Sequence, residues 1–561
     1  MKRTEAIEQL TAPGAQYELE DVEMYGRTCR WFRHAPTTLR DLFDQARSDA
    51  EFFVYDDERL TYEDAWQQAS RIGRLLVDNF DVQPGDRVAV SMRNYPEWVL
   101  AYMAATSIGA VIVGLNSLWQ PEEMEYGLID SGTKVLFADQ ERLDMLAKCT
   151  ELPTGLQVLG VRCESISTPN TQPLADALDA IGSSEMPAVA LDPDADATIF
   201  YTSGSTGHPK GVVSCHRAII AALMSWELDI HAAYLMLDAE PPVPESQPVA
   251  LVGVPLFHVT GTNAIFLHAF REQRRLISMY RWDVAQAAEL IERERVDRFI
   301  APAAMTGDLV EYARTSGRDL SSLAVVGGGG APRAPEQVRN IDKSFGEALP
   351  NTGWGMTETN AIGAGIAGAD YLERPESSGR CSAVLELRIV DEFGSVMPTG
   401  ERGELLVRGT SMCREYWHRP DANAGTFVDG WMRTGDVAYL DDEGFLFIVD
   451  RIKDLVIRGG ENIGCGTVEA AILEHPAVLE VSVYGVPDER LGEEVGATIH
   501  TSGDLTPEEL REFLAPHLAR FEIPRHIHIS PKPLPRTGSG KILKRDLRAE
   551  AATRVEALHA K

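Results

Sequence analysis

The stretch Tyr201-Thr202-Ser203-Gly204-Ser205-Thr206-Gly207-His208-Pro209-Lys210-Gly211-Val212 decides how the rest of this chain is interpreted. It follows a short apolar run, residues 197–200, that predicts a strand, and it precedes an apolar-periodic segment, residues 216–226, that predicts a capped helix. Its glycines let the backbone approach a ligand closely, its hydroxyls donate hydrogen bonds, and Lys210 adds a positive charge. Together these groups are suited to hold a polyphosphate.

The stretch differs from an ordinary P-loop, in which a lysine stands between glycine and serine or threonine. Here Pro209 precedes Lys210 and Gly211 follows it. Taken alone, the stretch also fits a Gly/Ser-rich surface loop, so motifs further along the chain have to decide between the two interpretations.

Length and composition place the chain among multidomain globular proteins. It has 561 residues, of which 44% are hydrophobic and 25% charged, and a single core stops growing at roughly 250–300 residues. The net charge of −32 argues against nucleic acid and anionic membrane surfaces as partners, although a local cationic patch can still bind small anions. Seven cysteines without paired spacing fit reduced thiols and predict a cytoplasmic location.

Neither the N-terminus nor any internal segment predicts membrane insertion. The first eight residues contain no apolar core of the signal-peptide kind. Residues 98–115 contain no charge, but Gly109 divides them into a helix-like half and a β-rich half. A buried helix followed by a buried parallel strand is therefore expected here rather than a membrane span.

The chain divides into three regions by texture. Residues 1–35 predict a peripheral extension. Residues 36–450 alternate strand-like runs (87–91, 134–138, 249–254 and 323–326) with helical ones, and from Leu385 short β segments follow one another. This predicts an α/β domain of stacked, mostly parallel sheets with a β-rich subdomain. Near Arg451 the pattern resets, and residues 451–561, with a capping box at Thr506, predict a small, mobile α+β C-terminal domain.

Four further segments join the glycine-rich stretch: residues 353–358 (GWGMTE), 431–436 (WMRTGD), 451–463 (RIKDLVIRGGENI) and 535–541 (PRTGSGK). In this order and spacing the five segments resemble the adenylate-forming superfamily of acyl-CoA synthetases, luciferases and peptide-synthetase adenylation domains. The resemblance covers roughly residues 35–550. It implies that a carboxylate attacks the α-phosphorus of ATP to give an acyl-adenylate and pyrophosphate.

The resemblance also implies roles for individual residues around the nucleotide. Glu358 would hold Mg²⁺, a cation that prefers carboxylate and phosphate oxygens, and Thr357 would contact the α-phosphate. Asp436 and Arg451 would bind the ribose hydroxyls. Lys541 would bridge the substrate carboxylate and the α-phosphate, with an ordinary surface lysine as the alternative. The full set of implied nucleotide-binding positions is Thr202, Ser203, Gly204, Ser205, Thr206, Gly207, Lys210, Gly329, Gly330, Ala331, Pro332, Gly353, Trp354, Gly355, Met356, Thr357, Asp436 and Arg451, with Gly329–Pro332 and Gly353–Trp354 enclosing the adenine.

For the second half-reaction the resemblance implies a moving small domain. The domain would swing about Lys453, withdraw Lys541 and present Gly459, Gly460 and Glu461 to the thiol of CoA. ATP, Mg²⁺ and CoA are thus the expected ligands. A homodimer is compatible with the sequence.

The acid itself is less well defined. Residues 255–261 (PLFHVTG) resemble the segment that CoA ligases of fatty and aryl acids place beside the acyl group, and no Asp stands there to pair with an amino acid. His258 could orient the carboxylate, shape the path of the thiol, or simply be a packed histidine. Thr260 and Gly261, with Trp226, Gly329 and Gly353, are expected to line the pocket. The expected substrate is a hydrophobic medium- or long-chain fatty, aryl or alicyclic acid.

Two other readings of the function remain open. The first is an adenylation enzyme that loads a separate carrier protein, although no carrier domain follows Lys561. The second is a nucleotide-binding regulatory protein without catalysis, although Lys541, Glu358 and Asp436 are all present.

Two further patterns predict no site. Residues 363–368 match a dinucleotide fingerprint by letters, but no strand is predicted before them and a flexible loop is expected. His526 and His528 share one face of a predicted strand and are expected to be exposed there, without a third metal ligand.

Overall fold

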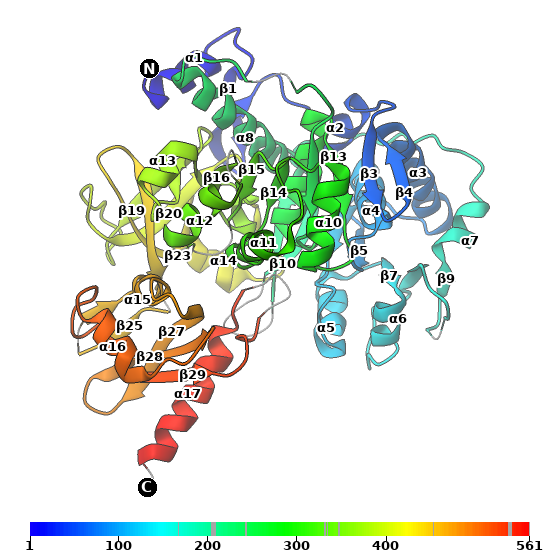
Figure 1. Cartoon of the computed structure of the whole chain (residues 1–561). Helices are drawn as coiled ribbons and strands as arrows, with labels where there is room; N and C mark the ends of the chain where they lie inside the picture. Colours follow the sequence, from blue (N-terminus) through cyan, green and yellow to red (C-terminus); the bar gives the residue numbers. More distant parts are fainter. Residues whose placement is uncertain are drawn as a thin grey trace.

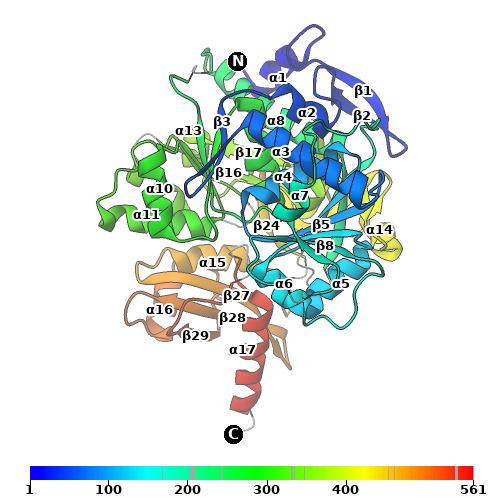
Figure 2. The ribbon, with the colours of Figure 1, turned by 90° about the vertical axis from the view of Figure 1, so that its right-hand side faces the viewer.

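The computed structural model describes residues 1–559 except 167, 203–208, 242–243, 330–332, 334, 346–347, 453, 460 and 537–540. A large body of two sheets and their covering helices carries a small domain on one side, and the C-terminal helix packs on the sheet of the small domain with its end pointing away from the large body (Figures 1 and 2). This arrangement confirms the predicted α/β class with a small C-terminal α+β domain.

One sheet of the large body has eight strands and is mostly parallel. Its order is β21 (Glu415–Tyr416), β11 (Lys210–Cys215), β10 (Asp196–Thr202), β6 (Val111–Gly114), β5 (Arg87–Ser91), β7 (Val135–Asp139), β8 (Gln157–Val161) and β9 (Thr171–Pro173). Only the β10–β11 and β11–β21 pairs are antiparallel. The two strands on either side of the glycine-rich stretch, β10 and β11, therefore pair with each other at the antiparallel side of this sheet.

The second sheet has fourteen strands and changes character along its width. Its parallel half contains β3 (Glu51–Tyr55), β13 (Arg275–Ser278), β12 (Val249–Val252), β14 (Arg298–Ile300), β15 (Val325–Gly327) and β16 (Leu349–Trp354), with β4 (Glu58–Thr61) at the edge. Its antiparallel half continues through β17 (Ala364–Ala367), β18 (Gly379–Cys381), β24 (Phe445–Arg451), β23 (Trp431–Leu440), β20 (Gly403–Gly409) and β19 (Leu385–Val390); β22 (Phe427–Val428) pairs with β23. The predicted β-rich subdomain is thus continuous with the parallel sheet.

The uncharged segment near residue 100 is a buried helix and strand, as predicted. Helix α4 (Pro96–Ser107) is buried on all sides between the sheets, and β6 follows it after Gly109, whose φ is +77°. Among the described residues one helix, α8 (His216–Met236), is long and apolar enough to cross a membrane. Most of it is buried inside the protein, where Cys215 caps its N-terminus, so it serves as a core helix.

The remaining helices of the large body cover the faces of the sheets (Figure 1). They are α2 (Leu39–Gln45), α3 (Tyr62–Arg74), η1 (Leu75–Asn79), α5 (Pro121–Ser131), α6 (Gln140–Leu146), α7 (Leu174–Asp179), η2 (Thr260–Leu267), α9 (His268–Glu272), α10 (Val284–Glu294), α11 (Ala303–Ser316), α12 (Pro335–Phe345), η3 (Thr357–Thr359), α13 (Gly368–Glu373) and α14 (Pro420–Thr426). Helix α3 begins at Thr61, whose side chain forms a capping box with Asp64.

The N-terminal extension is folded onto the large body. Helix α1 (Arg3–Thr11) packs on α8, and β1 (Leu19–Met24) and β2 (Arg27–Phe32) form a hairpin beside it. Arg3 pairs with Asp229 of α8 at 2.5 Å, which fixes the extension to the core helix.

The small domain has its own sheet and its own apolar core. Its strands are β25 (Val456–Arg458), β26 (Glu461–Ile463), β27 (Val478–Asp488), β28 (Gly492–Thr501) and β29 (His526–Ser530), and its helices are α15 (Cys465–Leu473), α16 (Pro507–Leu514) and α17 (Lys544–His559). β24 of the large body ends at Arg451 and β25 begins at Val456, so the described chain passes between the two sheets within a few residues of the predicted boundary.

Two local predictions are wrong. Residues 364–367 of the expected flexible loop form strand β17, which pairs antiparallel with β16. Small residues give this strand little propensity of its own, and pairing with a neighbouring strand supplies it. His526 and His528 do lie on a strand, β29, but both are half-buried rather than exposed.

Candidate active site

The first group of site residues lies at the end of the β10–β11 hairpin. Thr202 stands opposite Lys210 in the register, and its hydroxyl donates to the Lys210 carbonyl at 3.4 Å. The Lys210 ammonium lies 4.7 Å from the centre of the Tyr416 ring on β21. The Tyr416 hydroxyl donates to Oε1 of Glu358 at 2.7 Å, and Glu358 is 6% exposed. Lys210, where β11 begins, and the Glu358 carboxylate therefore both contact Tyr416, the first at its ring and the second at its hydroxyl.

A second group surrounds Asp436 on β23. One oxygen of its carboxylate pairs with Nε of Arg451 at 2.6 Å, and the other accepts from the indole N–H of Trp354 at 2.8 Å. Burial raises the pKa of Asp436, while Arg451, Trp354 and Lys541 act in the opposite direction. The Trp354 ring is itself buried, so the indole holds the carboxylate in one orientation.

Two glycines allow the backbone around this group to pack closely. A Cβ at Gly329 would lie 2.5 Å from the carbonyl oxygen of Gly353, and a Cβ at Gly353 would lie 2.6 Å from the carbonyl oxygen of Ala364. Any side chain at either position would collide with backbone, so these glycines bring the ends of β15, β16 and β17 together.

His258 forms the third part of the site. Its Nε2 atom is buried and has no hydrogen-bond partner in the described part of the chain. Burial and, to a lesser extent, the charge of Lys541 together lower the pKa of His258 to about 3. His258 is therefore a neutral imidazole at physiological pH, available to a ligand as a donor or an acceptor.

Lys541 connects the small domain to the site. It lies just before α17, on the small domain, and its charge acts on both His258 and Asp436, which belong to different strands and loops of the large body. The charge of this lysine is therefore close enough to both side chains to affect their pKa values.

Residues of the predicted acyl pocket lie on two elements. Thr260 and Trp226 are half-buried, on η2 and α8. Gly261 is buried, and a Cβ there would lie 2.4 Å from the carbonyl oxygen of Pro255. Its role in the structure is therefore to let the start of η2 pack on the preceding turn.

Some of the remaining predicted positions lie within the described residues, and the others lie outside them. Thr357 begins the short helix η3 with Met356 as its N-cap, and Gly355 lies just before it. Gly459 has a φ of +58° next to Glu461 on β26. Ser203, Gly204, Ser205, Thr206, Gly207, Gly330, Ala331, Pro332, Lys453 and Gly460 lie outside the described residues.

Sequence reasoning missed three buried polar residues that join the parts of the site. Tyr416 is one. Asn263 on η2 donates from its amide nitrogen to Oδ1 of Asn360 at 3.2 Å, and Asn360 donates to the carbonyl of Ser411 at 2.9 Å. Asn360 has a φ of +57°, and asparagine tolerates that conformation. No periodicity or spacing in the sequence marks these residues.

Asp450 links the two domains next to the predicted hinge. It lies on β24, and its carboxylate accepts hydrogen bonds from the backbone N–H groups of Cys465 and Gly466, at the first turn of α15. A carboxylate at a helix N-terminus satisfies unpaired N–H groups and interacts favourably with the helix dipole. In this structure the large body thus caps a helix of the small domain.

The neutral His258 leads to a stability prediction. The unfolded histidine titrates near 6.5 and the folded one near 3, so between these values the unfolded chain binds more protons and acidification favours unfolding. The stability that depends on a neutral His258 is fully present above pH 6.5 and is lost progressively as the pH falls toward 3. We expect the stability of wild type relative to His258→Asn to fall by about 1.4 kcal/mol per pH unit in this window.

Denaturant unfolding of both proteins from pH 7 to 4.5 measures this difference. His418→Asn, at an exposed histidine for which the structure shows no ion pair among the described residues, is the matched control and should keep a constant offset from wild type. A wild-type minus His258→Asn difference that does not change with pH would contradict the buried neutral state.

Family models identify the class of protein. Residues 42–417 match the AMP-binding enzyme model and residues 467–541 match the AMP-binding enzyme C-terminal domain. The chain therefore belongs to the adenylate-forming, AMP-binding enzyme family, on its acyl-CoA synthetase branch.

Individual relatives support the same placement. A long-chain-fatty-acid–CoA ligase of Mycobacterium tuberculosis is 31% identical over 89% of this chain and 94% of its own length. A feruloyl-CoA synthase of Amycolatopsis is 32% identical over 87% of this chain and 93% of its own. The solved structure of the o-succinylbenzoate CoA synthetase of Bacillus subtilis, in complex with its acyl-adenylate intermediate, is 27% identical, with a TM-score of 0.77 over 91% of this chain and 98% of that one.

The donor set around Glu358 fits Mg²⁺, which the family implies. Among the described residues no group of three or more His, Cys, Asp or Glu side chains could hold a metal by itself. Mg²⁺ in nucleotide sites is typically bound by one or two carboxylates together with phosphate oxygens. Glu358 would supply the carboxylate, and the cation would neutralise phosphate charge.

Proposed function

We propose that the protein is an ATP-dependent acid–CoA ligase acting on a hydrophobic carboxylic acid. The proposal is carried by the buried carboxylate of Asp436, held by Arg451 and Trp354, together with His258, whose buried Nε2 has no partner among the described residues. The charge of Lys541, on the small domain, acts on both groups. The CoA ligases among its relatives, of fatty and of aryl acids, support CoA as the acceptor.

In the first half-reaction an oxygen of the substrate carboxylate forms a bond to the α-phosphorus, and the bond from that phosphorus to the bridging oxygen of pyrophosphate breaks. Negative charge gathers between carboxylate and α-phosphate. Lys541 lies where it can neutralise that charge, while Lys210 and the hairpin hold the departing phosphates and Asp436 fixes the ribose. Positioning and charge neutralisation are the protein's main contributions.

In the second half-reaction the sulfur of CoA attacks the acyl carbon, the thiol proton is lost, and AMP leaves. We propose that the small domain rotates about Lys453 for this step and presents the Gly459–Glu461 segment to the incoming pantetheine. Rotation would withdraw Lys541 and open the path that it covers.

The proposal is tested by pyrophosphate release across fatty, aryl and alicyclic acids, with ATP, Mg²⁺ and CoA present. The expected result is acid-dependent pyrophosphate release together with an acyl-CoA product. Release with an acyl-adenylate that only a carrier protein consumes would favour the carrier-loading alternative. Absence of release with every acid would overturn the proposal.

Tyr416→Phe should slow adenylation without unfolding the protein. The substitution removes only the hydroxyl that donates to Glu358. A hydrogen bond to a charged group contributes enough to predict roughly a tenfold to hundredfold slower adenylation. Pyrophosphate release against Mg²⁺ and ATP concentration is the measurement. Tyr439→Phe, in a ring pair with Phe447 on β23 and β24, is the control and should behave as wild type.

A further inference from the structure

A buried polar cluster lies at the far end of the helical stretch that begins beside His258. η2 and α9 run on from Thr260 to Glu272, and this brings His268 against residues at the starts of β13 and β14. There a small cavity has an apolar side formed by Ala250, Leu251, Ala264 and Ile300 and a polar side that includes His268 and Arg298. The cavity therefore combines an apolar wall with a polar floor.

Two nitrogen atoms of this floor have no hydrogen-bond partner among the described residues. They are Nε2 of His268, a residue that is 4% exposed, and Nε of Arg298. Their neighbour Arg274 is fully engaged, because it pairs with Glu272 at 2.8 Å and Asp297 at 2.5 Å. Buried polar groups in folded proteins are nearly always satisfied. The pair of unsatisfied nitrogens therefore indicates an oxygen acceptor that is supplied from outside the chain.

The charges around the cavity favour a neutral acceptor. Arg274 and Arg298 are balanced by Glu272 and Asp297, with Glu272 lying 3.4 Å from Arg298. Burial lowers the pKa of His268, which keeps its imidazole neutral. A carboxylate at this end of a bound acid would add a buried negative charge with no counter-charge. A hydroxyl or keto oxygen can accept hydrogen bonds from both nitrogens and adds no charge.

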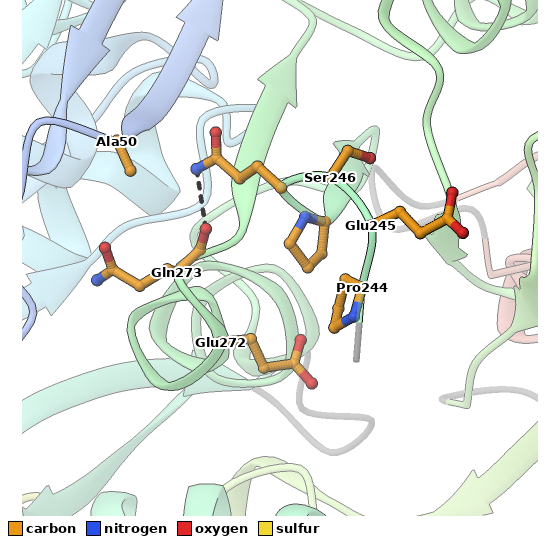
Figure 3. Close-up of a pocket in the computed structure, with 8 residues that line it drawn as sticks. Ala50, Pro244, Glu245, Ser246, Glu272 and Gln273 are labelled. Carbon is orange, nitrogen blue, oxygen red and sulfur yellow. Dashed lines mark hydrogen bonds between the residues drawn. The ribbon is translucent and has the colours of Figure 1, made fainter. Parts of the chain in front are cut away.

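The outer wall of the cluster faces a surface depression. Glu272, whose carboxylate holds the two arginines, also lines this depression with Gln273 and the Pro244–Ser246 segment (Figure 3). Glu272 therefore stands between the depression and the inner cavity, and closes the polar floor from the outside.

The position of the cavity relates it to the acyl side of the site. Ala264, which lines it, follows Thr260 by about one turn of a π-helix, so the two side chains lie near one face. Trp226, which was predicted to line the acyl pocket, packs edge-on against His268 with ring centres 6.0 Å apart. The ten residue-to-residue steps from His258 to His268 correspond to about 15 Å along a helix. The cavity itself, of about 10 Å³, holds about one water-sized group.

We infer that the acyl site ends in this polar floor, where His268 Nε2 and Arg298 Nε donate hydrogen bonds to an oxygen at the distal end of the substrate acid. The inference rests on the proposed ligase function and narrows its substrate class. The acid has an apolar body and carries one neutral oxygen function, a hydroxyl or a ketone, at or near the end opposite its carboxylate.

The test compares matched acids with wild-type enzyme. Straight-chain acids from hexanoic to dodecanoic acid are each paired with the terminal hydroxy acid and the corresponding keto acid, and kcat/KM is measured by pyrophosphate release. At the length that reaches the floor, the oxygenated acid should exceed its plain counterpart by about tenfold to a hundredfold, because the plain acid leaves two buried donors unsatisfied. Equal kcat/KM values for the two members of every pair would contradict the inferred oxygen-binding role of His268 and Arg298 and would leave the proposed ligase function intact.

Variants identify the residues responsible. Arg298→Met and His268→Leu should each reduce the ratio of oxygenated to plain acid toward one, since both keep the apolar volume of the side chain. Arg295→Met, at an exposed arginine paired with Asp319, is the control and should keep the wild-type ratio. Unchanged ratios in both floor variants would overturn the assignment. If no acid releases pyrophosphate the ligase function fails, and calorimetric titration of the same pairs then tests the floor by affinity alone.

Discussion

Lys541→Ala is expected to slow pyrophosphate release by about a hundredfold to a thousandfold, which is the typical loss when one group that stabilises developing charge is removed. The charge of this lysine acts on His258 and on Asp436, which is consistent with the position proposed for it between the carboxylate and the α-phosphate. Transfer of the acyl group from a supplied acyl-adenylate to CoA should be unaffected, because the charge that Lys541 neutralises develops while the carboxylate attacks the α-phosphorus, and the acyl-adenylate has already passed that step.

The two half-reactions are measured separately, as pyrophosphate release and as AMP release from the acyl-adenylate. Lys532→Ala, on an exposed turn of the same domain, is the control and should leave both unchanged. If Lys541→Ala slowed both half-reactions to the same degree, the lysine would not have the role assigned to it.

Asp436→Ala should have the second largest effect. The buried carboxylate pairs with Arg451 and Trp354 and is the predicted partner of the ribose hydroxyls, so its loss removes the ligand contact and leaves the buried indole N–H of Trp354 without its partner. We expect kcat/KM for ATP to fall by about a hundredfold, mostly through KM. Asp442→Ala, at an exposed position in the turn between β23 and β24, is the control.

The pH dependence provides a second check on Asp436. Because burial raises its pKa, the carboxylate should be protonated at a higher pH than an exposed aspartate. ATP binding is then present above that pKa and is lost as the pH falls through it. Asp436→Asn should lack this acid limb. An identical acid limb in the variant would show that another group is responsible.

The sequence was most informative where local patterns determine local structure. Alternating apolar runs predicted β5, β7 and β12, and the capping box at Thr506 predicted the start of α16. Such features depend on neighbours a few residues away.

The features that sequence reasoning missed depend on distant partners. Strand β11 follows the glycine-rich stretch directly and exists as a strand because it pairs with β10 on one side and β21 on the other. Tyr416 reaches Glu358 across 58 positions in the chain, and nothing near either residue marks the contact. The five motifs lead to a prediction of which residues bind ATP, but they do not indicate the contacts of Tyr416, Asn263 and Asn360.

The carboxylate of Asp450 makes one orientation of the small domain measurable. It caps α15 from the large body, so any rotation that moves α15 away releases the N–H groups of Cys465 and Gly466 to solvent, at a cost of about 1 kcal/mol. Hydrogen exchange at these two amides would therefore measure the relative populations of the two proposed orientations of the small domain during turnover. The substitution Asp450→Ala should increase the population of the orientation proposed for thioester formation, because it removes the cap of α15 and no predicted substrate contact.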